Sequence, residues 1–198
     1  MNLQAVTMQG QYARLEPLRL DHAAALSEAV QDGELWRLWY TAIPTPAAMA
    51  SEVQRRLDLQ ASGSMLPFAV IHLSDERMAG MTTYMHIDSA NRRLEIGSTW
   101  YRQSLQRTAL NTECKRMLLG HAFEELDCIA VEFRTHWHNT ASRRGIERLG
   151  AKLDGVLRSH QMAANGSLRD TCVYSIVASE WPAVRAYLDH ALSTPRRP

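Results

Sequence analysis

A loop that leads into a helix is the first place where the residues could do chemistry. Residues 102–110 are polar, and an amphipathic stretch begins at residues 111–113. The first N–H groups of a helix lack backbone partners and the helix dipole favours anions, so such a junction can bind phosphate. The side chains that would add charge or donors are Arg102, Arg107, Thr108, Asn111 and Thr112. A capped helix on a solvated loop is the simpler alternative.

A second candidate lies at Asn139-x-x-Ser142, after a strand-like segment. Asn is a strong helix N-cap, and this spacing places both residues on one side of a helix's first turn. Asn139 would then cap the helix, hold an amide-bearing ligand, or do both. The Ser142 hydroxyl would face a ligand or bond to nearby backbone. Arg143 and Arg144 would reach phosphate groups or lie in solvent.

Histidines and aromatic residues form a third group of candidates. His136 and His138 point to the same side of an extended segment, a spacing that can bind metal, but no third or fourth ligand lies nearby in sequence. We therefore expect no metal, and His138 is instead a candidate for a base beside a substrate. The aromatic side chains that either line a pocket or pack as core are Trp36, Trp39 and Tyr40.

Strand patterns supply most of the scaffold for these residues. Runs of β-forming residues separated by short polar turns predict a meander, and a strand that follows a crossover helix is normally parallel to its predecessor. Asn165–Gly166 predicts the turn of a terminal hairpin. The predicted strands are 11–19, 67–73, 79–87, 93–100, 128–135, 153–162 and 170–177.

Helices are predicted between these strands from capping residues and apolar periodicity. Asp21 would cap a helix over 22–31, and Thr45 would cap the next, with Pro46 at its first position. In that second helix the stripe Met49, Val53 and Leu57 leaves Arg55, Arg56 and Asp58 outside. A helix over 111–126 follows, then a short one from 139 or 140 to Gly150. Ser179 would cap the last, with Pro182 in its first turn and Trp181, Val184 and Leu188 facing inward.

Composition excludes several classes of protein. The chain has 198 residues, 45% hydrophobic and 22% charged, which is typical of one globular domain. Its formal net charge of +1 argues against extensive nucleic-acid binding. We find no signal peptide and no apolar stretch long enough to cross a membrane, so we expect a cytoplasmic protein. Cys114, Cys128 and Cys172 fit reduced thiols that pack in the interior.

The order of elements and several motifs resemble the GNAT superfamily of acyl-CoA-dependent N-acyltransferases, in particular the branch with the ribosomal-protein N-terminal acetyltransferases. The likeness runs from residues 15–18 to residues 170–176. It is strongest at residues 95–97, 112–115, Asn139-x-x-Ser142, 149–151 and 155–158. We therefore expect one α/β domain over 1–198, with 193–198 as a frayed tail. Its central sheet would be mixed, mostly antiparallel, with six to seven strands, flanking helices and a C-terminal helix.

The resemblance also implies a reaction. An acetyl group would move from acetyl-CoA to a primary amine of a small molecule or a protein N-terminus by direct attack. Glu95 is then the candidate base and Ser142 the candidate partner of the leaving thiolate. The acceptor would contact Trp36, Trp39, Tyr40 and His138. The residues implied to contact acetyl-CoA are Thr99, Trp100, Arg107, Thr108, Ala109, Leu110, Asn111, Thr112, Asn139, Ser142 and Arg143.

Two departures from the family pattern keep alternatives open. Arg107 stands where the family's phosphate loop usually has its first glycine, and Ile146 stands where a tyrosine is common. Because glycine allows close backbone approach and positive φ, Arg107 either changes the loop path or contributes a guanidinium–phosphate pair instead. A non-catalytic acyl-CoA-binding module on the same scaffold is the main alternative, and a metal-dependent hydrolase using His136 and His138 is the weaker one. A homodimer is left open.

Overall fold

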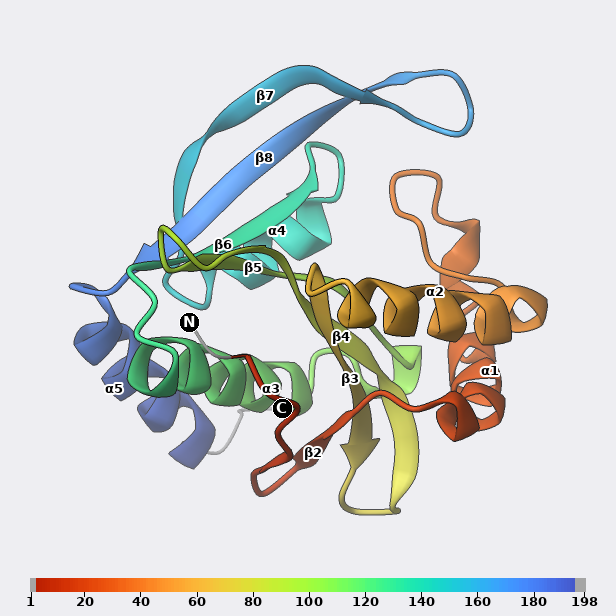
Figure 1. The fold of residues 1–198 in the computed structure, drawn as a ribbon, viewed down its shortest axis with the longest axis horizontal. Helices are drawn as coiled ribbons and strands as arrows, with labels where there is room; N and C mark the ends of the chain where they lie inside the picture. The colour runs from red at the N-terminus through yellow and green to blue at the C-terminus, as the bar shows by residue number, and fades with distance from the viewer. Residues whose placement is uncertain (1–2, 195–198) are drawn as a thin grey trace.

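Eight strands form one sheet in the computed structural model, which describes residues 3–194 (Figure 1). Their order across the sheet is β1-β2-β3-β4-β5-β6-β8-β7, and β5–β6 is the parallel pair among antiparallel neighbours. The predicted mixed, mostly antiparallel sheet is confirmed, with two-residue β1 as the strand not predicted. The strands are β1 Met8–Gln9, β2 Ala13–Pro17, β3 Met65–His72, β4 Arg77–Asp88, β5 Arg93–Tyr101, β6 Ala130–His136, β7 Lys152–Met162 and β8 Leu168–Val177.

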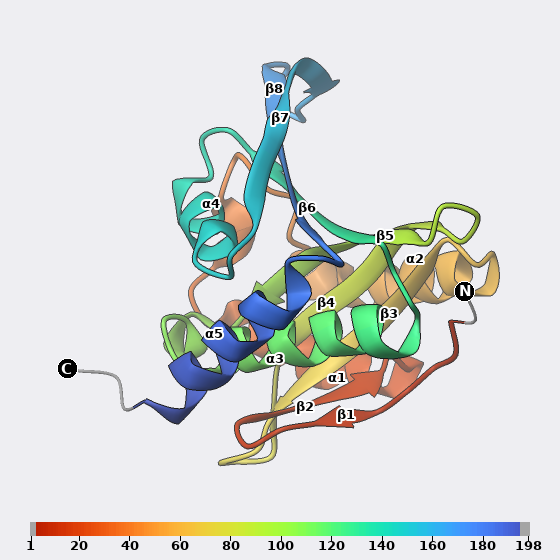
Figure 2. The same cartoon turned by 90° about the vertical axis from the view of Figure 1, so that its left-hand side faces the viewer.

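Five α-helices and several short helical turns join the strands of the described chain. Helices α1 and α2 cover one face of the sheet, and α3 and α5 cover the other (Figures 1 and 2). The helices are α1 Ala23–Gln31, α2 Met49–Ala61, α3 Leu110–Gly120, α4 Thr140–Glu147 and α5 Trp181–Ser193. The short turns are η1 Leu20–His22, η2 Leu35–Arg37, η3 Pro46–Ala48, η4 Gln103–Leu105 and the π-helical η5 His121–Glu125. Ser193 therefore ends α5, and residues 195–198 of the predicted tail lie outside the described residues.

Two apolar cores lie on the two faces of the sheet, because strand side chains alternate between the faces. On β5, Leu94 and Ile96 pack toward α3, so Glu95 lies on the face that α1 and α2 cover. On β6, Val131 and Phe133 pack toward the same core as Leu94. Glu95 and the even-numbered side chains of β6 therefore share the α1–α2 side, which we call the acceptor face.

Strands β5 and β6 are paired only at their beginnings. Their register runs through Arg93–Ala130, Leu94–Val131 and Glu95–Glu132, and the described structure records no β5–β6 pair beyond this point. Residues 96–101 of β5 and 133–136 of β6 thus continue as neighbours without a shared ladder. We call this unpaired stretch the split. Glu95 lies at its closed end.

A β-bulge interrupts β5 beside the split. Between the pairs Thr83–Gly97 and Met81–Trp100, β5 carries one residue more than β4. Ser98, within this stretch, has φ 47° and so lies in the left-handed region. A bulge leaves one residue outside the ladder and bends the strand. The bulge therefore takes β5 out of its regular pairing with β4 three residues after Glu95.

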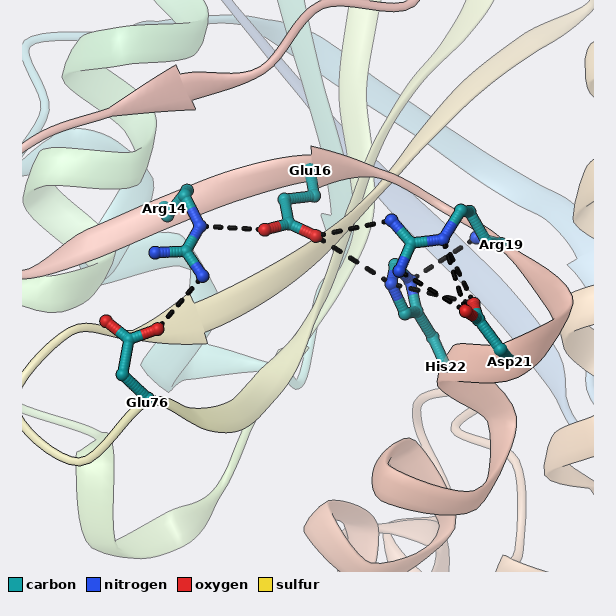
Figure 3. A network of polar contacts seen from close by, with 6 residues as sticks. All are labelled: Arg14, Glu16, Arg19, Asp21, His22 and Glu76. Carbon is teal, nitrogen blue, oxygen red and sulfur yellow. Dashed lines mark hydrogen bonds and ion pairs between the residues drawn. The ribbon is translucent and has the colours of Figure 1, made fainter.

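Two predicted helix caps are wrong. Asp21 pairs with Arg19, and the chain enters α1 through η1, where His22 Nδ1 accepts from the Arg19 N–H at 3.3 Å (Figure 3). This turn belongs to a charged network that spans Arg14, Glu16, Arg19, Asp21, His22 and Glu76. Ser179 does not cap α5, which begins after Glu180 without a side-chain cap. By contrast, Thr45 accepts from the Ala48 N–H at 3.2 Å as predicted.

Candidate active site

Glu95 combines burial with few hydrogen bonds. Its side chain is 4% exposed, and one oxygen, Oε2, lies 2.8 Å from His86 Nδ1 and 3.6 Å from Arg134 Nε. Burial raises the pKa of this carboxyl, and the nearby His86 and Arg134 partly oppose that rise. A carboxylate with a raised pKa is a better proton acceptor near neutral pH. The predicted base therefore has a suitable environment at the closed end of the split.

The loop before α3 has the backbone conformation that a glycine would supply. Arg107 has φ 62°, in the left-handed region that residues with a Cβ adopt at a cost of about 1 kcal/mol or more. Because Arg107 adopts the backbone conformation of a glycine, the loop can follow the family's path without the glycine. The side chain is exposed, just ahead of the N–H groups at the start of α3. This junction keeps the geometry of an anion site.

Several side chains of this loop are already engaged. Thr108 Oγ1 donates to the Leu105 carbonyl at 2.7 Å, and Arg102 Nε donates to the Met78 carbonyl at 2.7 Å. Leu110 and Thr112 are 1% and 2% exposed. What these positions can offer a ligand is therefore mainly backbone N–H groups. The Arg107 side chain is exposed, and Ala109 and Asn111 are partly exposed.

Thr99 and Trp100, on β5, have contacts that the sequence did not indicate. Trp100 is buried in the core of the α1–α2 side. Thr99 Oγ1 accepts from Lys115 Nζ at 2.9 Å, and the same ammonium reaches Thr82 Oγ1 at 3.3 Å. Burial lowers the pKa of Lys115 to about 8. The Thr99 hydroxyl is thus held by a buried lysine of α3.

The start of α4 places Asn139 and Ser142 as the sequence predicts. Asn139 Oδ1 accepts from the Ser142 N–H at 3.1 Å, so the N-cap role is present. The Ser142 hydroxyl makes no hydrogen bond with residues 3–194. Arg143 is engaged: its guanidinium lies 4.2 Å from the centre of the Trp137 ring, and its Nε donates to Tyr174 Oη at 3.1 Å. Ser142 remains available to a ligand.

An aromatic cluster connects two distant parts of the sequence. The Trp39 ring lies 5.1 Å from His136 and 5.8 Å from His138, and Tyr40 lies 6.4 Å from His136. Three of the four predicted acceptor residues therefore gather at the end of β6, on the acceptor face. The fourth, Trp36, packs instead against the core of the α1–α2 side.

Arg56 is a correction to the predicted pattern, since it was placed outside the stripe of α2. It is 2% exposed, with Nε bonded to Glu52 Oε1 at 2.7 Å. Its Nη1 donates to Thr83 Oγ1 at 2.7 Å and to the Ser98 carbonyl at 3.2 Å. The position lies three residues after Val53, on the buried face, and the ion pair makes its burial tolerable. Arg56 thus ties α2 to the bulge of β5.

Two open hollows lie away from the loop. One, of about 470 Å³, lies on the acceptor face beside the site, with Glu132 and Arg134 among its lining residues. The larger, of about 520 Å³, lies between the N-terminal segment and α3 and contains no predicted site residue. Residues 3–194 contain no group of three or more His, Cys, Asp or Glu side chains that could hold a metal ion. Within the same residues, no helix has the length and apolar character needed to span a membrane.

Comparison with known proteins agrees with this geometry. The sequence profile of the acetyltransferase (GNAT) domain matches residues 13–152. The chain belongs to this family. YdaF of Bacillus subtilis (strain 168), whose assignment as a ribosomal N-acetyltransferase is provisional, is 32% identical over 109 residues, which cover 55% of this chain and 58% of YdaF.

Solved GNAT structures cover nearly the whole chain. A provisionally assigned acetyltransferase from T. thermophilus is 31% identical, with a TM-score of 0.84 over 97% of this chain and all of that one. Mycobacterium smegmatis RimJ, solved with CoA-disulfide, shares the fold at 23% identity and a TM-score of 0.77, covering 90% of this chain and 88% of RimJ. The predicted GNAT fold and the resemblance to the ribosomal-protein branch are confirmed. The chain is a member of a family of N-acetyltransferases that use acetyl-CoA.

Proposed function

We propose that the protein transfers the acetyl group of acetyl-CoA to a primary amine of a small molecule or a protein N-terminus. The observation that carries the proposal is the position of Glu95: a buried carboxylate with a raised pKa, at the closed end of the split. A mostly protonated amine must lose a proton before it attacks a thioester. Glu95 would accept that proton, and His86 beside it is exposed and links the carboxylate to solvent.

The residues at the open end of the split fit an acyl-CoA. Arg107 supplies the left-handed backbone of a phosphate loop, and the start of α3 supplies N–H groups for a pyrophosphate. Asn139 and Ser142 lie at the end of β6, where a pantetheine arm between the strands would pass. Acetyl-CoA supplies an activated thioester. The Ser142 hydroxyl would donate to the departing sulfur, and the bulge of β5 would offer backbone N–H to the oxyanion.

Two measurements on the wild-type protein test this function. Calorimetry should detect acetyl-CoA binding, and a free-thiol assay should detect CoA release that depends on an added amine. The amine panel should include peptides with free N-termini and polyamines. Binding without amine-dependent thiol release would support the non-catalytic acyl-CoA-binding module instead. Absence of binding at millimolar acetyl-CoA would overturn both assignments.

A further inference from the structure

Arg169 is a half-buried cation without a carboxylate partner. It lies on β8, and among residues 3–194 its guanidinium makes one hydrogen bond, from Nε to Thr171 Oγ1 at 3.1 Å. Its side chain is partly buried, and this burial lowers its pKa. Burying a cation without an anion costs free energy. A ligand that supplied the anion would remove that cost.

The strand register places Arg169 on the acceptor face. Cys172 and Tyr174 of β8 pack into the core on the α3–α5 side, so the odd-numbered positions Thr171 and Arg169 face the other way. Thr171 is paired with His136 of the aromatic cluster. The hydrogen bond from Arg169 to Thr171 therefore brings the guanidinium beside that cluster.

Electrostatic effects agree with this placement. The Arg169 charge contributes to lowering the pKa of His136, and Glu95 acts to raise the pKa of Arg169. Such effects act between charges that lie close together in a partly desolvated site. Arg169 therefore lies within range of both the candidate base and the aromatic cluster.

The other arginines of the acceptor face differ from Arg169 in their partners. Arg134 Nη2 binds Glu132 at 2.9 Å, and Arg56 Nε binds Glu52 at 2.7 Å. Their charges are already compensated. The two Nη groups of Arg169 make no hydrogen bond with the described residues, so a planar pair of donors is available. This fork matches the geometry of a carboxylate.

We propose that Arg169 binds a carboxylate of the acceptor, so that the substrate class is an amine that also carries a carboxylate. The inference rests on the proposed function, because it assumes that the amine is presented to Glu95. Two sources share this chemistry: a free amino acid, through its α-carboxylate, and a peptide with an acidic side chain near its N-terminus. Arg169 is a specificity residue in this scheme, and the proton transfer stays with Glu95.

The test compares ligands that differ only in the carboxylate. Binding of N-acetyl-L-alanine and N-acetyl-L-alaninamide in the presence of CoA requires no turnover. Turnover is measured with L-alanine against L-alaninamide, and with amidated Ala-Asp-Ala against amidated Ala-Asn-Ala. The variants are Arg169→Gln, Arg169→Lys and, as a matched control, Arg148→Gln at an exposed position after α4. Melting temperatures are recorded for all of them.

We expect the wild type and Arg148→Gln to prefer the carboxylate member of at least one pair over its amide member by at least tenfold, both in binding and in turnover. Arg169→Gln should lose that preference, mainly through a higher KM, and leave the amide member within about twofold. Arg169→Lys, which keeps charge without the fork, should lie between them. If Arg169→Gln unfolds, the carboxylate preference of the wild type and its reduction in Arg169→Lys still test whether Arg169 binds the carboxylate.

The outcomes separate this inference from the proposed function. Carboxylate-selective binding that Arg169→Gln abolishes, without any thiol release, would uphold the carboxylate site and overturn acetyl transfer to these amines. Thiol release with equal preference for both members of every pair would uphold the acetyltransferase and overturn the carboxylate site. Equal losses on both members in the Arg169 variants would also overturn it, because that pattern indicates a structural role.

Discussion

Two buried carboxylates, Glu95 at the closed end of the split and Glu113 in the first turn of α3, differ in their partners. Glu113 accepts three backbone N–H groups, from Gln11, Tyr12 and Ala13, at 2.7–2.8 Å. Glu95 has an exposed histidine on one oxygen and a raised pKa. Both residues fall in motifs that carry the family resemblance. Burial alone therefore does not distinguish a candidate base from a structural carboxylate. The hydrogen-bond partners of the two carboxylates make that distinction.

The same contrast extends to the surroundings of the two residues. Both oxygens of Glu113 are engaged by backbone N–H groups, and a Cβ at Gly10 would lie 2.3 Å from the Glu113 carboxylate carbon. The start of α3 therefore acts as a scaffold that presents backbone N–H groups. The Glu95 carboxylate, by contrast, accepts no backbone N–H from the described residues, and the Ser142 hydroxyl at the start of α4 makes no hydrogen bond with them. Glu113 therefore has the contacts of a structural residue, and Glu95 is the proposed base.

The largest expected effect is on turnover. Glu95→Gln should lower kcat by about 10²–10⁴-fold, because the amide cannot accept a proton. Acetyl-CoA affinity and the melting temperature should change little. Thiol release and calorimetry on the same preparation check this. A variant as active as the wild type would remove Glu95 from the mechanism and turn attention to His138 or a water relay.

Replacing Arg107 by Gly and by Ala separates backbone from charge at the start of α3. Both variants remove the guanidinium and should weaken CoA binding by about 1.5–3 kcal/mol if it pairs with phosphate. Only Gly adopts φ 62° without strain, so the Gly variant should be about 1 kcal/mol more stable to unfolding than the Ala variant, which keeps the strain of the wild type. Calorimetry and urea unfolding measure the two effects. Wild-type CoA affinity in the Gly variant would assign Arg107 no role in binding.

Glu113→Gln should affect stability. The amide group of Gln would turn N–H donors toward backbone N–H groups that now have acceptors, at a cost of about 2 kcal/mol. Urea unfolding gives the change in free energy. The residual activity per folded molecule should stay within about threefold of the wild type. A catalytic loss as large as that of Glu95→Gln, at unchanged stability, would contradict the structural role of Glu113 and make it a candidate catalytic residue.

Ser142→Ala should slow acetyl transfer by at least about tenfold, or 1.4 kcal/mol of barrier. Asn139 keeps its hydrogen bond to the backbone N–H of residue 142, so α4 should form normally. Acetyl-CoA binding should remain nearly unchanged. Equal rates for variant and wild type would leave Ser142 as a helix-start residue. A fallen melting temperature would show that its role is structural.

The smallest effect is on the pH dependence of stability. Burial lowers the pKa values of His22, His121 and His136. Below about pH 6.5 the unfolded chain therefore binds more protons than the folded protein. The free energy of unfolding should fall by on the order of 1 kcal/mol as the pH falls from 7 to 5.5.

The raised pKa of Glu95 acts in the opposite sense, because the folded protein then binds more protons than the unfolded chain. Urea unfolding of Glu95→Gln across the same pH range isolates the histidines. Stability that stays constant or rises as the pH falls would contradict these shifts.

Local patterns predicted most of the fold and part of the site. The Asn139-to-Ser142 spacing, the Thr45 cap and the inward faces of Trp181, Val184 and Leu188 depend on neighbours within one or two turns. Such contacts can be inferred from sequence. The predicted caps at Asp21 and Ser179 are wrong although capping is also a local contact. The sequence spacing does not show which neighbouring residue takes the capping position or which partner competes for the side chain.

Contacts between distant segments were beyond the sequence pattern. The apolar stripe of α2 leaves Arg56 outside, because charge usually marks the exposed face, yet Glu52, Thr83 and Ser98 together satisfy its guanidinium. The register of β8 against β6 places Thr171, the hydrogen-bond partner of Arg169, opposite His136, and no spacing in the chain indicates that pairing. The sequence contains one indication that Arg56 is buried, namely its position three residues after Val53 on the same face of α2. These residues lie on the acceptor face, where the sequence was least informative.

A crystal structure of the protein with CoA would show whether the split holds the cofactor. We predict the pyrophosphate at the start of α3 beside Arg107, the pantetheine arm in the split between β5 and β6, and the sulfur near both Glu95 and Ser142. CoA bound elsewhere, for example in the hollow between the N-terminal segment and α3, would contradict it. So would a sulfur that lies remote from Glu95.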